Sequence, residues 1–339
     1  MAERSPFESG HVGRHRGSGR VALAALLVVG LAVGCGGAPA PAGSAGAVAS
    51  SAATPVSSAS GPAASSAATP AGSAPGSAVA SSGPVSWKLA WSDEFNGAAG
   101  VPPDPKTWGN DLGDGSAAGI VGWGNNEREY YTDSPENAAT DGKGNLLITV
   151  RTADGSQACY YGPCEYTSAR LLTKDRYEIQ YGRVEARIKV PGGVGLWPAF
   201  WMLGTDIGQV GWPRCGEIDV MEFVGRRPNE VLGTIHGPGY SGSSGFTKGV
   251  DLDSPVADDF HTFAIDWRPG HIVWSLDEKV YHQASPADVA PDAWVFDHPF
   301  FLILNVAVGG NLGGPVAPDT AFPQAMAVDY VRLYQEVTP

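Results

Sequence analysis

The sequence predicts an all-β protein, a sandwich or jelly roll, and three observations lead to this prediction. Only 17% of the 339 residues are charged, whereas glycine (46), tryptophan (10), tyrosine (11) and phenylalanine (11) are abundant. Short strand-like segments alternate with loops that are rich in Gly, Pro, Asp and Asn. No long amphipathic helix competes with these segments. Many short strands joined by such loops are typical of two packed antiparallel sheets.

Residues 1–34 are predicted to be a bacterial lipoprotein-type signal peptide. Four arginines precede the apolar run VALAALLVVGLAV, which is too short for the roughly 20 residues of a membrane-spanning helix. The run ends in LAVGC, which resembles a lipoprotein cleavage site, so Cys35 is expected to carry the lipid. An ordinary secretory signal with an incidental cysteine is the alternative. Both interpretations predict an extracytoplasmic protein, either tethered to the cell envelope or secreted.

Residues 35–86 are predicted to form a disordered linker. Of the 51 residues in 36–86, 45 are Ala, Ser, Gly or Pro. Because this segment has almost no apolar surface to bury, ordering it would cost conformational entropy without return. We therefore expect one globular domain, at residues 87–339, tethered by this linker.

The charge of the predicted domain limits its partners. Residues 87–339 hold 18 Lys and Arg against 33 Asp and Glu, a formal net charge of −15. Such a surface repels phosphate backbones and anionic lipid heads, so we expect no nucleic-acid partner and no membrane contact except through a lipid on Cys35. Neutral substrates are the easiest fit.

The strand pattern is clearest in RVEARIKV, residues 183–190. Val, Ala, Ile and Val face one way, while Arg, Glu, Arg and Lys face the other, as in a half-buried antiparallel strand. The continuous apolar run FFLILNVAV, residues 300–308, suits a central strand. Further strand-like segments are Leu146 to Val150, His261 to Trp267, Ile272 to Leu276 and Val328 to Tyr334.

Three cysteines follow Cys35. Cys159 and Cys164 enclose the short loop of CYYGPC, and since exported proteins meet an oxidising environment, we expect a disulfide between them, with a metal pair as the weaker alternative. Cys215 stands beside a group of carboxylates, which makes a catalytic thiol worth weighing. No His lies near it in the sequence, so a buried free thiol is the preferred interpretation.

Candidate catalytic residues concentrate in GEIDVMEF. On a regular strand Glu217 and Asp219 would share a face with Met221, and Glu222 would point to the opposite side. A β-bulge near Val220 and Met221 would return Glu222 to the face of Glu217. Like charges this close push their pKa values apart, so that one carboxylate ionises while another keeps its proton, as glycoside hydrolysis through a covalent intermediate requires. Three solvated carboxylates on an edge strand are the alternative.

The segment GLWPAFWML supplies candidate substrate contacts. Trp197 and Trp201 would share one face of a strand, with only the small Ala199 between them. Indole rings so spaced can stack on the apolar faces of sugar rings, although two tryptophans in an apolar run are as often part of a core.

These motifs resemble glycoside hydrolase family 16, in its laminarinase-like branch, which cleaves β-1,3-glucan. GEIDVMEF is similar to the bulged active-site motif of that family. The following segments occur in the order expected for the family and extend the resemblance over essentially the whole globular part: WSDEFNG, GWGNNEREYYT, YTSARLLTK, GRVEARIKVPGGVGLWPAFWML, FFLILNVAVGG and VDYVRLYQ. The resemblance implies a β-jelly roll with a substrate cleft across its concave face, and a retaining, endo-acting mechanism.

The resemblance also implies residue roles. Glu217 would be the nucleophile, Glu222 the general acid that later acts as base, and Asp219 an assistant between them. Substrate contacts are implied for five residues: Asn126, Arg170, Trp197, Trp201 and His236. For Arg170 the alternative is a solvated strand residue, and for His236 it is a loop residue.

No cofactor is expected for catalysis, but one structural calcium is implied. Asp329 matches a late carboxylate that holds calcium in relatives, with Glu94 or the Gly142 carbonyl as companions. Two segments depart from the family pattern. NLGG stands where relatives usually have NWPG, and CYYGPC looks inserted, so the ends of the cleft are expected to differ.

Two functions from different classes follow from these observations. The first is an endo-β-1,3-glucanase, with mixed-linkage β-1,3-1,4-glucan as the nearest rival substrate. The second is a non-catalytic glucan-binding or sensing domain, although such proteins typically lack one or both catalytic Glu, and both are present here. Sulfated galactans are disfavoured by the acidic domain. A monomer is expected, because no heptads or apolar stripe suggest an oligomer.

Overall fold

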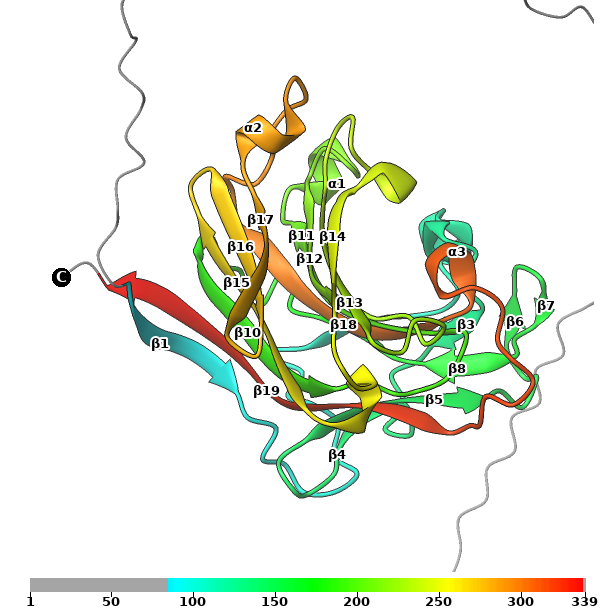
Figure 1. Cartoon of the computed structure of the whole chain (residues 1–339). Helices are drawn as coiled ribbons and strands as arrows, with labels where there is room; N and C mark the ends of the chain where they lie inside the picture. The colour runs from blue at the N-terminus through cyan, green and yellow to red at the C-terminus, as the bar shows by residue number, and fades with distance from the viewer. Residues whose placement is uncertain (1–84, 338–339) are drawn as a thin grey trace, which may run out of the picture. The chain divides into compact units, whose positions relative to one another are not determined.

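The computed structural model describes residues 85–337, and Figure 1 shows them as a curved β-sandwich. The predicted signal peptide, Cys35 and all of the predicted linker except Val85 and Ser86 lie outside the described residues. The folded domain begins one residue before its predicted start, because Ser86 already pairs with Val337. None of the helices in residues 85–337 has the length and apolar character needed to cross a membrane.

One sheet has ten strands and the other has seven, and a short hairpin stands apart. The ten-stranded sheet contains β1 (Ser86–Asp93), β3 (Glu129–Tyr131), β4 (Ala138–Thr140), β5 (Leu146–Thr152), β8 (Tyr166–Ser168), β10 (Gly182–Lys189), β15 (His261–Arg268), β16 (His271–Leu276), β17 (Lys279–Ala284) and β19 (Gln324–Val337). The seven-stranded sheet contains β2 (Gly109–Asp111), β9 (Arg170–Leu172), β11 (Leu196–Gly204), β12 (Glu217–Glu222), β13 (Glu230–His236), β14 (Phe246–Asp251) and β18 (Phe300–Val308). The hairpin consists of β6 (Ala158–Cys159) and β7 (Gly162–Pro163).

Helical segments are short and lie in the connections. The α-helices have four residues each, as expected from the absence of helical periodicity: α1 (Ile207–Val210), α2 (Pro286–Val289) and α3 (Gly310–Gly313). The 3-10 helices are η1 (Ser116–Ala118), η2 (Val121–Gly124), η3 (Gly242–Ser244) and η4 (Val256–Asp258).

The seven-stranded sheet carries the functional residues and has the strand order β14-β13-β12-β11-β18-β9-β2. All of its neighbouring strands are antiparallel. The ten-stranded sheet is also antiparallel except where β3 runs parallel to β8. Strands distant in sequence are neighbours in both sheets, as in a jelly roll, so the predicted all-β jelly-roll sandwich is confirmed.

The predicted strands are found where the patterns placed them. FFLILNVAV forms β18, whose nine residues are all buried, and it lies between β11 and β9. RVEARIKV forms most of β10, with Val184, Ala186 and Ile188 fully buried. Glu185 was expected on the exposed face but is 9% exposed, because it accepts hydrogen bonds from Arg183 and Tyr330 there.

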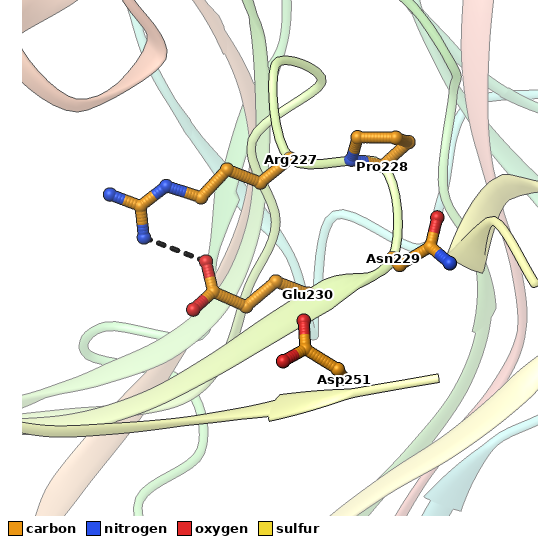
Figure 2. A pocket seen from close by; sticks show the side chains of 5 residues that line it. All are labelled: Arg227, Pro228, Asn229, Glu230 and Asp251. Atoms are coloured by element: carbon orange, nitrogen blue, oxygen red, sulfur yellow. Dashed lines mark hydrogen bonds and ion pairs between the residues drawn. The ribbon is translucent and has the colours of Figure 1, made fainter. Parts of the chain in front are cut away.

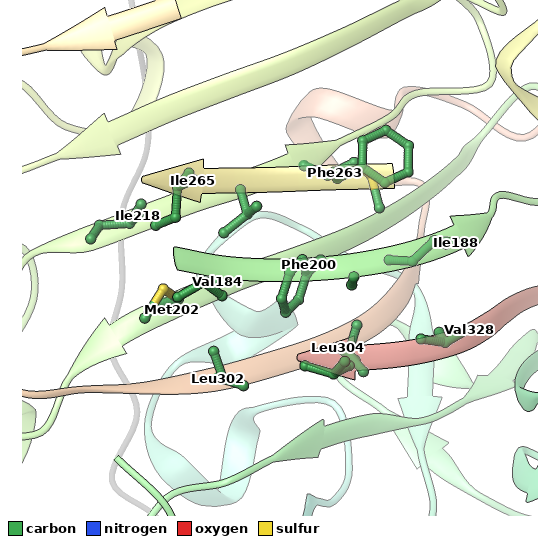
Figure 3. Packing of buried hydrophobic residues seen from close by; sticks show 14 of the residues in the cluster. Val184, Ile188, Phe200, Met202, Ile218, Phe263, Ile265, Leu302, Leu304 and Val328 are labelled. Atoms are coloured by element: carbon green, nitrogen blue, oxygen red, sulfur yellow. The ribbon is translucent and has the colours of Figure 1, made fainter. Parts of the chain in front are cut away.

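The core fills the space between the two sheets. Alternate apolar residues of β10, β15 and β19 meet those of β11, β12 and β18, as Figure 3 shows. Ten of them are labelled there: Val184, Ile188, Phe200, Met202, Ile218, Phe263, Ile265, Leu302, Leu304 and Val328. The core takes one face of the seven-stranded sheet. The other face, which we call the open face, carries polar and aromatic side chains and a smaller apolar cluster: Leu172, Leu203, Cys215, Phe301 and Ile303.

Candidate active site

The carboxylate strand β12 contains a β-bulge. Against β11, Trp201 pairs with Asp219 while its neighbour Phe200 pairs with Met221, so Val220 has no partner. The register against β13 shifts over the same stretch. The strand thus holds one residue more than its neighbour β11, as the sequence predicted.

This extra residue brings the three carboxylates together. Val220 and Met221 are both buried in the core, at 1% and 0% exposure. The alternation then resumes, so Glu222 returns to the open face that Glu217 and Asp219 already occupy. Without the bulge, Glu222 would point into the apolar core.

Indole N–H groups donate hydrogen bonds to both outer carboxylates. Trp212 Nε1 donates to Glu217 Oε2 over 2.6 Å, and Trp197 Nε1 donates to Glu222 Oε1 over 3.1 Å. Thr234 lies on the other side of Glu222, with its Oγ1 3.4 Å from Oε2. Each of these donors favours the ionised carboxylate.

Burial nevertheless raises the pKa of all three carboxyl groups. For Glu217 and Glu222 burial is the largest cause and the charge of Asp219 the next, and both pKa values rise to about 8. Burial raises the pKa of Asp219 to about 7. At neutral pH the cluster therefore holds protons that ordinary carboxyl groups would have released.

Of the two glutamates, Glu217 has the surroundings that better support a negative charge. Its side chain keeps 17% of its surface exposed, whereas Glu222 is buried. It also accepts the shortest hydrogen bond of the group, from Trp212. Solvent and a close donor stabilise an anion, so Glu217 is the glutamate that is better suited to act as the anion.

His236 is the last residue of β13 and pairs with Glu217, so it is not a loop residue. Its Nε2 lies 3.3 Å from Asp219 Oδ2 and 4.0 Å from Glu217 Oε1. Ligand atoms of these three residues lie within 4.8 Å of one another, close enough to hold a small cation. A cation bound there would occupy the carboxylate oxygens of Glu217 and Asp219.

The two tryptophans of β11 share the open face. Trp197 and Trp201 are half-buried, and Ala199 stands between them, while Phe200 and Met202 point into the core. Trp201 Nε1 donates to Asn305 Oδ1 over 2.7 Å. Both indoles are thus held at their N–H edge, which fixes their orientation toward a ligand on this face.

Arg170 of β9 is only 8% exposed. Its guanidinium lies 4.8 Å from the ring centroid of Trp201 and 4.6 Å from that of Trp123, and its Nε lies 3.0 Å from Asp111 Oδ2. Arg170 therefore packs over the ring of Trp201 and is not a solvated strand residue.

A buried polar network continues behind Asn305. Its Nδ2 donates to the Tyr131 hydroxyl over 3.0 Å, and that hydroxyl donates to Glu127 Oε2 over 3.3 Å. Next to it, Glu129 accepts a hydrogen bond from the Val308 N–H over 2.6 Å. Burial, and then the charge of Glu127, hold the pKa of Glu129 well above its ordinary value.

Sequence reasoning missed this network and Trp212. The one polar residue inside FFLILNVAV, Asn305, was a signal that something buried needed a hydrogen bond. The other members gave no comparable signal, since Glu127, Glu129 and Tyr131 lie in a polar segment and Trp212 lies in a loop.

The predicted calcium residues are engaged elsewhere. Both carboxylate oxygens of Glu94 accept hydrogen bonds from Arg332, over 2.9 and 2.8 Å. Asp329 Oδ2 accepts one from Arg187 over 2.6 Å. Gly142 adopts φ 74° in the turn between β4 and β5. Because Arg332 and Arg187 already neutralise the two carboxylates, these side chains do not fit a shared calcium site.

The cysteines differ in state. Cys159 and Cys164 are joined by a disulfide across the β6–β7 hairpin. Cys215 is free and fully buried, and burial raises the pKa of its thiol to about 12. A thiol that stays protonated is no nucleophile, so the catalytic interpretation of Cys215 is wrong.

One hollow of about 410 Å³ lies away from the carboxylates. Figure 2 shows its lining from the start of β13 and the end of β14: Arg227, Pro228, Asn229, Glu230 and Asp251. Glu230 begins β13, whereas His236 ends it beside Glu217, so this hollow is not where the chemistry takes place.

A β-sandwich whose open face combines paired carboxylates with half-exposed indoles is the arrangement of a polysaccharide-cleaving glycoside hydrolase. The family model for glycosyl hydrolases family 16 matches residues 126–332. The chain belongs to this family.

Relatives from three organisms agree with this assignment. A beta-glucanase of Rhodothermus marinus is 42% identical over 74% of this chain and 86% of its own length. The laminarinase catalytic domain of Thermotoga maritima is 47% identical, with a TM-score of 0.70, over 74% of this chain and 99% of its own. The endo-beta-1,3-glucanase of Pyrococcus furiosus is 46% identical, with a TM-score of 0.71, over 75% and 96%.

Proposed function

We propose that this protein is an endo-acting β-1,3-glucanase that cleaves laminarin-type glucan with retention of configuration. One observation carries the proposal: the β12 bulge places Glu217, Asp219 and Glu222 on one sheet face beside Trp197. The relatives named for laminarinase and endo-beta-1,3-glucanase activity support the choice of polymer.

Glu217 serves as nucleophile and Glu222 as general acid. Glu217 attacks the anomeric carbon while Glu222 gives its proton to the departing glycosidic oxygen, which leaves a covalent glycosyl-enzyme. Water then attacks the same carbon, Glu222 takes a proton from it, and the bond to Glu217 breaks. The surroundings support this division, because Glu217 is the carboxylate with solvent and a close donor, and Glu222 is the more buried one.

Asp219 assists both steps. Its charge raises the pKa values of both Glu217 and Glu222, and His236 lies on its open side. When Glu217 becomes bonded to the sugar it loses its charge, so the pKa of Glu222 falls and the residue can act as a base in the second step. The negative charge of Asp219 limits this decrease in the pKa of Glu222.

The substrate is a neutral polymer. Trp197 and Trp201 offer indole surfaces to sugar rings. Arg170 lies over the Trp201 ring and His236 lies beside Asp219, and both are proposed to contact the substrate together with Asn126. A formal net charge of −15 over residues 87–339 opposes sulfated galactans. Mixed-linkage β-1,3-1,4-glucan shares the neutral backbone and is the second expected substrate. Because both Glu217 and Glu222 are present in a bulged strand, a purely glucan-binding role is disfavoured.

We further infer that the enzyme works outside the cytoplasm as a monomer. The apolar run after four arginines and the LAVGC sequence favour export with lipidation of Cys35. The disulfide between Cys159 and Cys164 suits an oxidising compartment. Radiolabelled fatty-acid incorporation that disappears in Cys35→Ser would support the lipid anchor, and equal labelling of both proteins would refute it.

The deciding experiment measures reducing-end release by the purified protein on laminarin, mixed-linkage glucan and agarose. We expect fast cleavage of laminarin, slower cleavage of mixed-linkage glucan and none of agarose. Glu217→Gln keeps the shape of the site but removes the nucleophile, so its rate should fall by about 10³-fold or more. Retained binding of laminarin without cleavage by the wild type would instead establish the non-catalytic role.

A further inference from the structure

A second hollow, of about 400 Å³, lies beside the open face. We call it the distal hollow. Three segments line it: the loop before β3, the start of β8, and the loop that carries α3 after β18. Its lining residues are Asn126, Arg128, Glu165, Tyr166, Gly309, Gly310, Asn311, Gly314, Pro315 and Val316.

The distal hollow adjoins the catalytic residues through Trp197. A Cβ atom added to Gly310 would come within 3.5 Å of the Trp197 ring, so the wall of the hollow touches the indole that hydrogen-bonds Glu222. Asn126 Nδ2 donates to Asn311 Oδ1 over 2.9 Å and ties two of the lining segments together. A chain lying on Trp197 would therefore reach the hollow with its next units.

The lining suits a neutral, hydroxyl-rich ligand. Arg128 and Glu165 form two hydrogen bonds, of 3.2 and 2.5 Å, and so cancel each other's charge. The exposed amides of Asn126 and Asn311 can each donate and accept. Tyr166 adds a half-buried ring at the same wall. Such a mixture of amides, a neutralised ion pair and one aromatic ring is typical of sugar-binding surfaces rather than of anion sites.

The disulfide loop does not line the distal hollow but contacts two of its lining residues, Arg128 and Glu165. The Tyr161 hydroxyl donates to the Arg128 carbonyl oxygen and accepts a hydrogen bond from the Glu165 N–H over 3.0 Å. The Arg128 guanidinium lies 4.2 Å from the centre of the same ring. Tyr161 itself sits inside the loop closed by Cys159 and Cys164. The segment that looks inserted in the sequence thus holds Arg128 and Glu165 in place.

We propose that the distal hollow binds a glucosyl unit of the polysaccharide beyond those at Trp197 and Trp201, and that the Cys159–Cys164 loop fixes its shape. The proposal rests on the glucanase function above, and it assigns one end of the cleft to residues that this loop holds in place. Short oligosaccharides end before the hollow, so only longer chains gain from it.

The test compares kcat/KM of the full-length protein on laminaritriose and laminarihexaose. Arg128→Ala removes the ion pair and the contact with Tyr161, and Asn311→Ala removes an exposed amide without disturbing the core. We expect each to lower kcat/KM on the hexaose by about fivefold to tenfold, mainly through KM, and on the triose by less than about twofold. The double variant Cys159→Ser/Cys164→Ser should show the same length dependence.

Arg268→Ala is the matched control. Arg268 also pairs with a glutamate, Glu336, over 2.7 Å, and its guanidinium also lies over an aromatic ring, that of Trp87, but on the ten-stranded sheet. This variant should leave both oligosaccharides unaffected. Circular dichroism and Tm show whether each variant folds. If Arg128→Ala does not fold, the length dependence of Asn311→Ala decides whether the distal hollow binds the substrate.

Two outcomes would overturn the proposal, and they differ. In the first, the wild type cleaves the hexaose, but Asn311→Ala lowers kcat/KM equally on both oligosaccharides or changes it on neither. This result refutes the role of the distal hollow and leaves the glucanase function standing. Wild-type protein that cleaves no β-1,3-glucan refutes the glucanase function, and the hollow with it.

Discussion

Asp219 illustrates, at the scale of single residues, what the active site costs the fold. It is 3% exposed, its Oδ2 has no hydrogen-bond partner among the described residues, and burial raises its pKa to about 7. The folded protein therefore holds a proton that the unfolded chain releases near pH 4. The stability that comes with this proton is complete below about pH 4 and is lost as the pH rises through about 7.

Asp219→Asn should therefore stabilise the protein at high pH. Asn cannot ionise, so the variant escapes the loss, and it also relieves the repulsion felt by Glu217 and Glu222. We expect its Tm to exceed that of the wild type by about 2–4 °C or more at pH 8, which corresponds to about 1 kcal/mol in a domain of this size. At pH 4 the difference should vanish. Calorimetry at both pH values measures it.

The control for this prediction is Asp253→Asn, which changes an exposed aspartate. Its Tm should follow that of the wild type at both pH values. An Asp219→Asn protein that is equally stable to the wild type at pH 8, or less stable, would show that the buried carboxylate is not the source of the loss.

At the scale of elements, the bulge in β12 is the feature on which the site depends. A strand has a period of two, so the six residues of β12 place Glu217 and Glu222 on one face only because the bulge adds an unpaired residue. Deleting Val220 would remove the bulge and leave a regular strand, in which Met221 still faces the core and Glu222 still faces the open side. The path between Glu217 and Glu222 would be one residue shorter, so the two carboxylates would be displaced relative to each other. We expect the deletion variant to lose roughly 10²-fold in kcat and to unfold several degrees below the wild type.

Val220→Ala separates the bulge from the packing. The substitution keeps the extra residue but removes two methyl groups from a site that is 1% exposed. It should lower the free energy of unfolding by about 1–3 kcal/mol and leave the kcat of the folded protein within about twofold of the wild type. A wild-type kcat in the deletion variant would show that the bulge is not needed to position Glu222 relative to Glu217.

The strand β18 shows a second way in which an element serves the site. Eight of its nine residues are apolar and buried, and the ninth, Asn305, lies at 5% exposure and contacts both Trp201 and Tyr131. A central strand tolerates a polar residue only when its hydrogen bonds are satisfied, as they are here. The same strand thus provides the rigidity of the sheet and fixes the orientation of Trp201, an indole on the open face.

At the scale of the whole molecule, the contacts described here for the site join residues within 85–337. β1 closes it by pairing with β19 from Ser86 to Asp93, and Trp91 stacks on Tyr177 with ring centroids 5.0 Å apart. A fragment of residues 85–339 should therefore have a Tm within about 2 °C of the full-length protein and an unchanged kcat/KM on laminarin.

A shorter fragment of residues 94–339 tests the limit of the domain. It lacks β1 and leaves one edge of β19 unpaired, so its Tm should fall by several degrees or more, and it should aggregate more readily. Equal stability of the two fragments would show that β1 is not part of the cooperative unit. Low activity of the longer fragment on laminarin would show that residues 1–84 contribute to function.

The sequence by itself determined the fold class, the strands and the catalytic motif. These depend on local patterns, because alternation along a strand and the spacing of EIDVME are set by neighbouring residues. Even the bulge could be predicted, since only an extra residue puts Glu217 and Glu222 on one face. The pairing of Cys159 with Cys164 was also within reach, because only four residues separate them.

Only the tertiary structure decided which distant residues meet. His236 lies beside Asp219 because β13 pairs with β12, Arg170 supports Trp201 because β9 and β11 both flank β18, and Asp329 is paired with an arginine of β10. Such contacts join segments tens of residues apart, and the sequence pattern of each segment is the same whether or not they meet. The distal hollow arises in the same way, from two loops and the start of β8, which the packing of the two sheets brings together beside the open face.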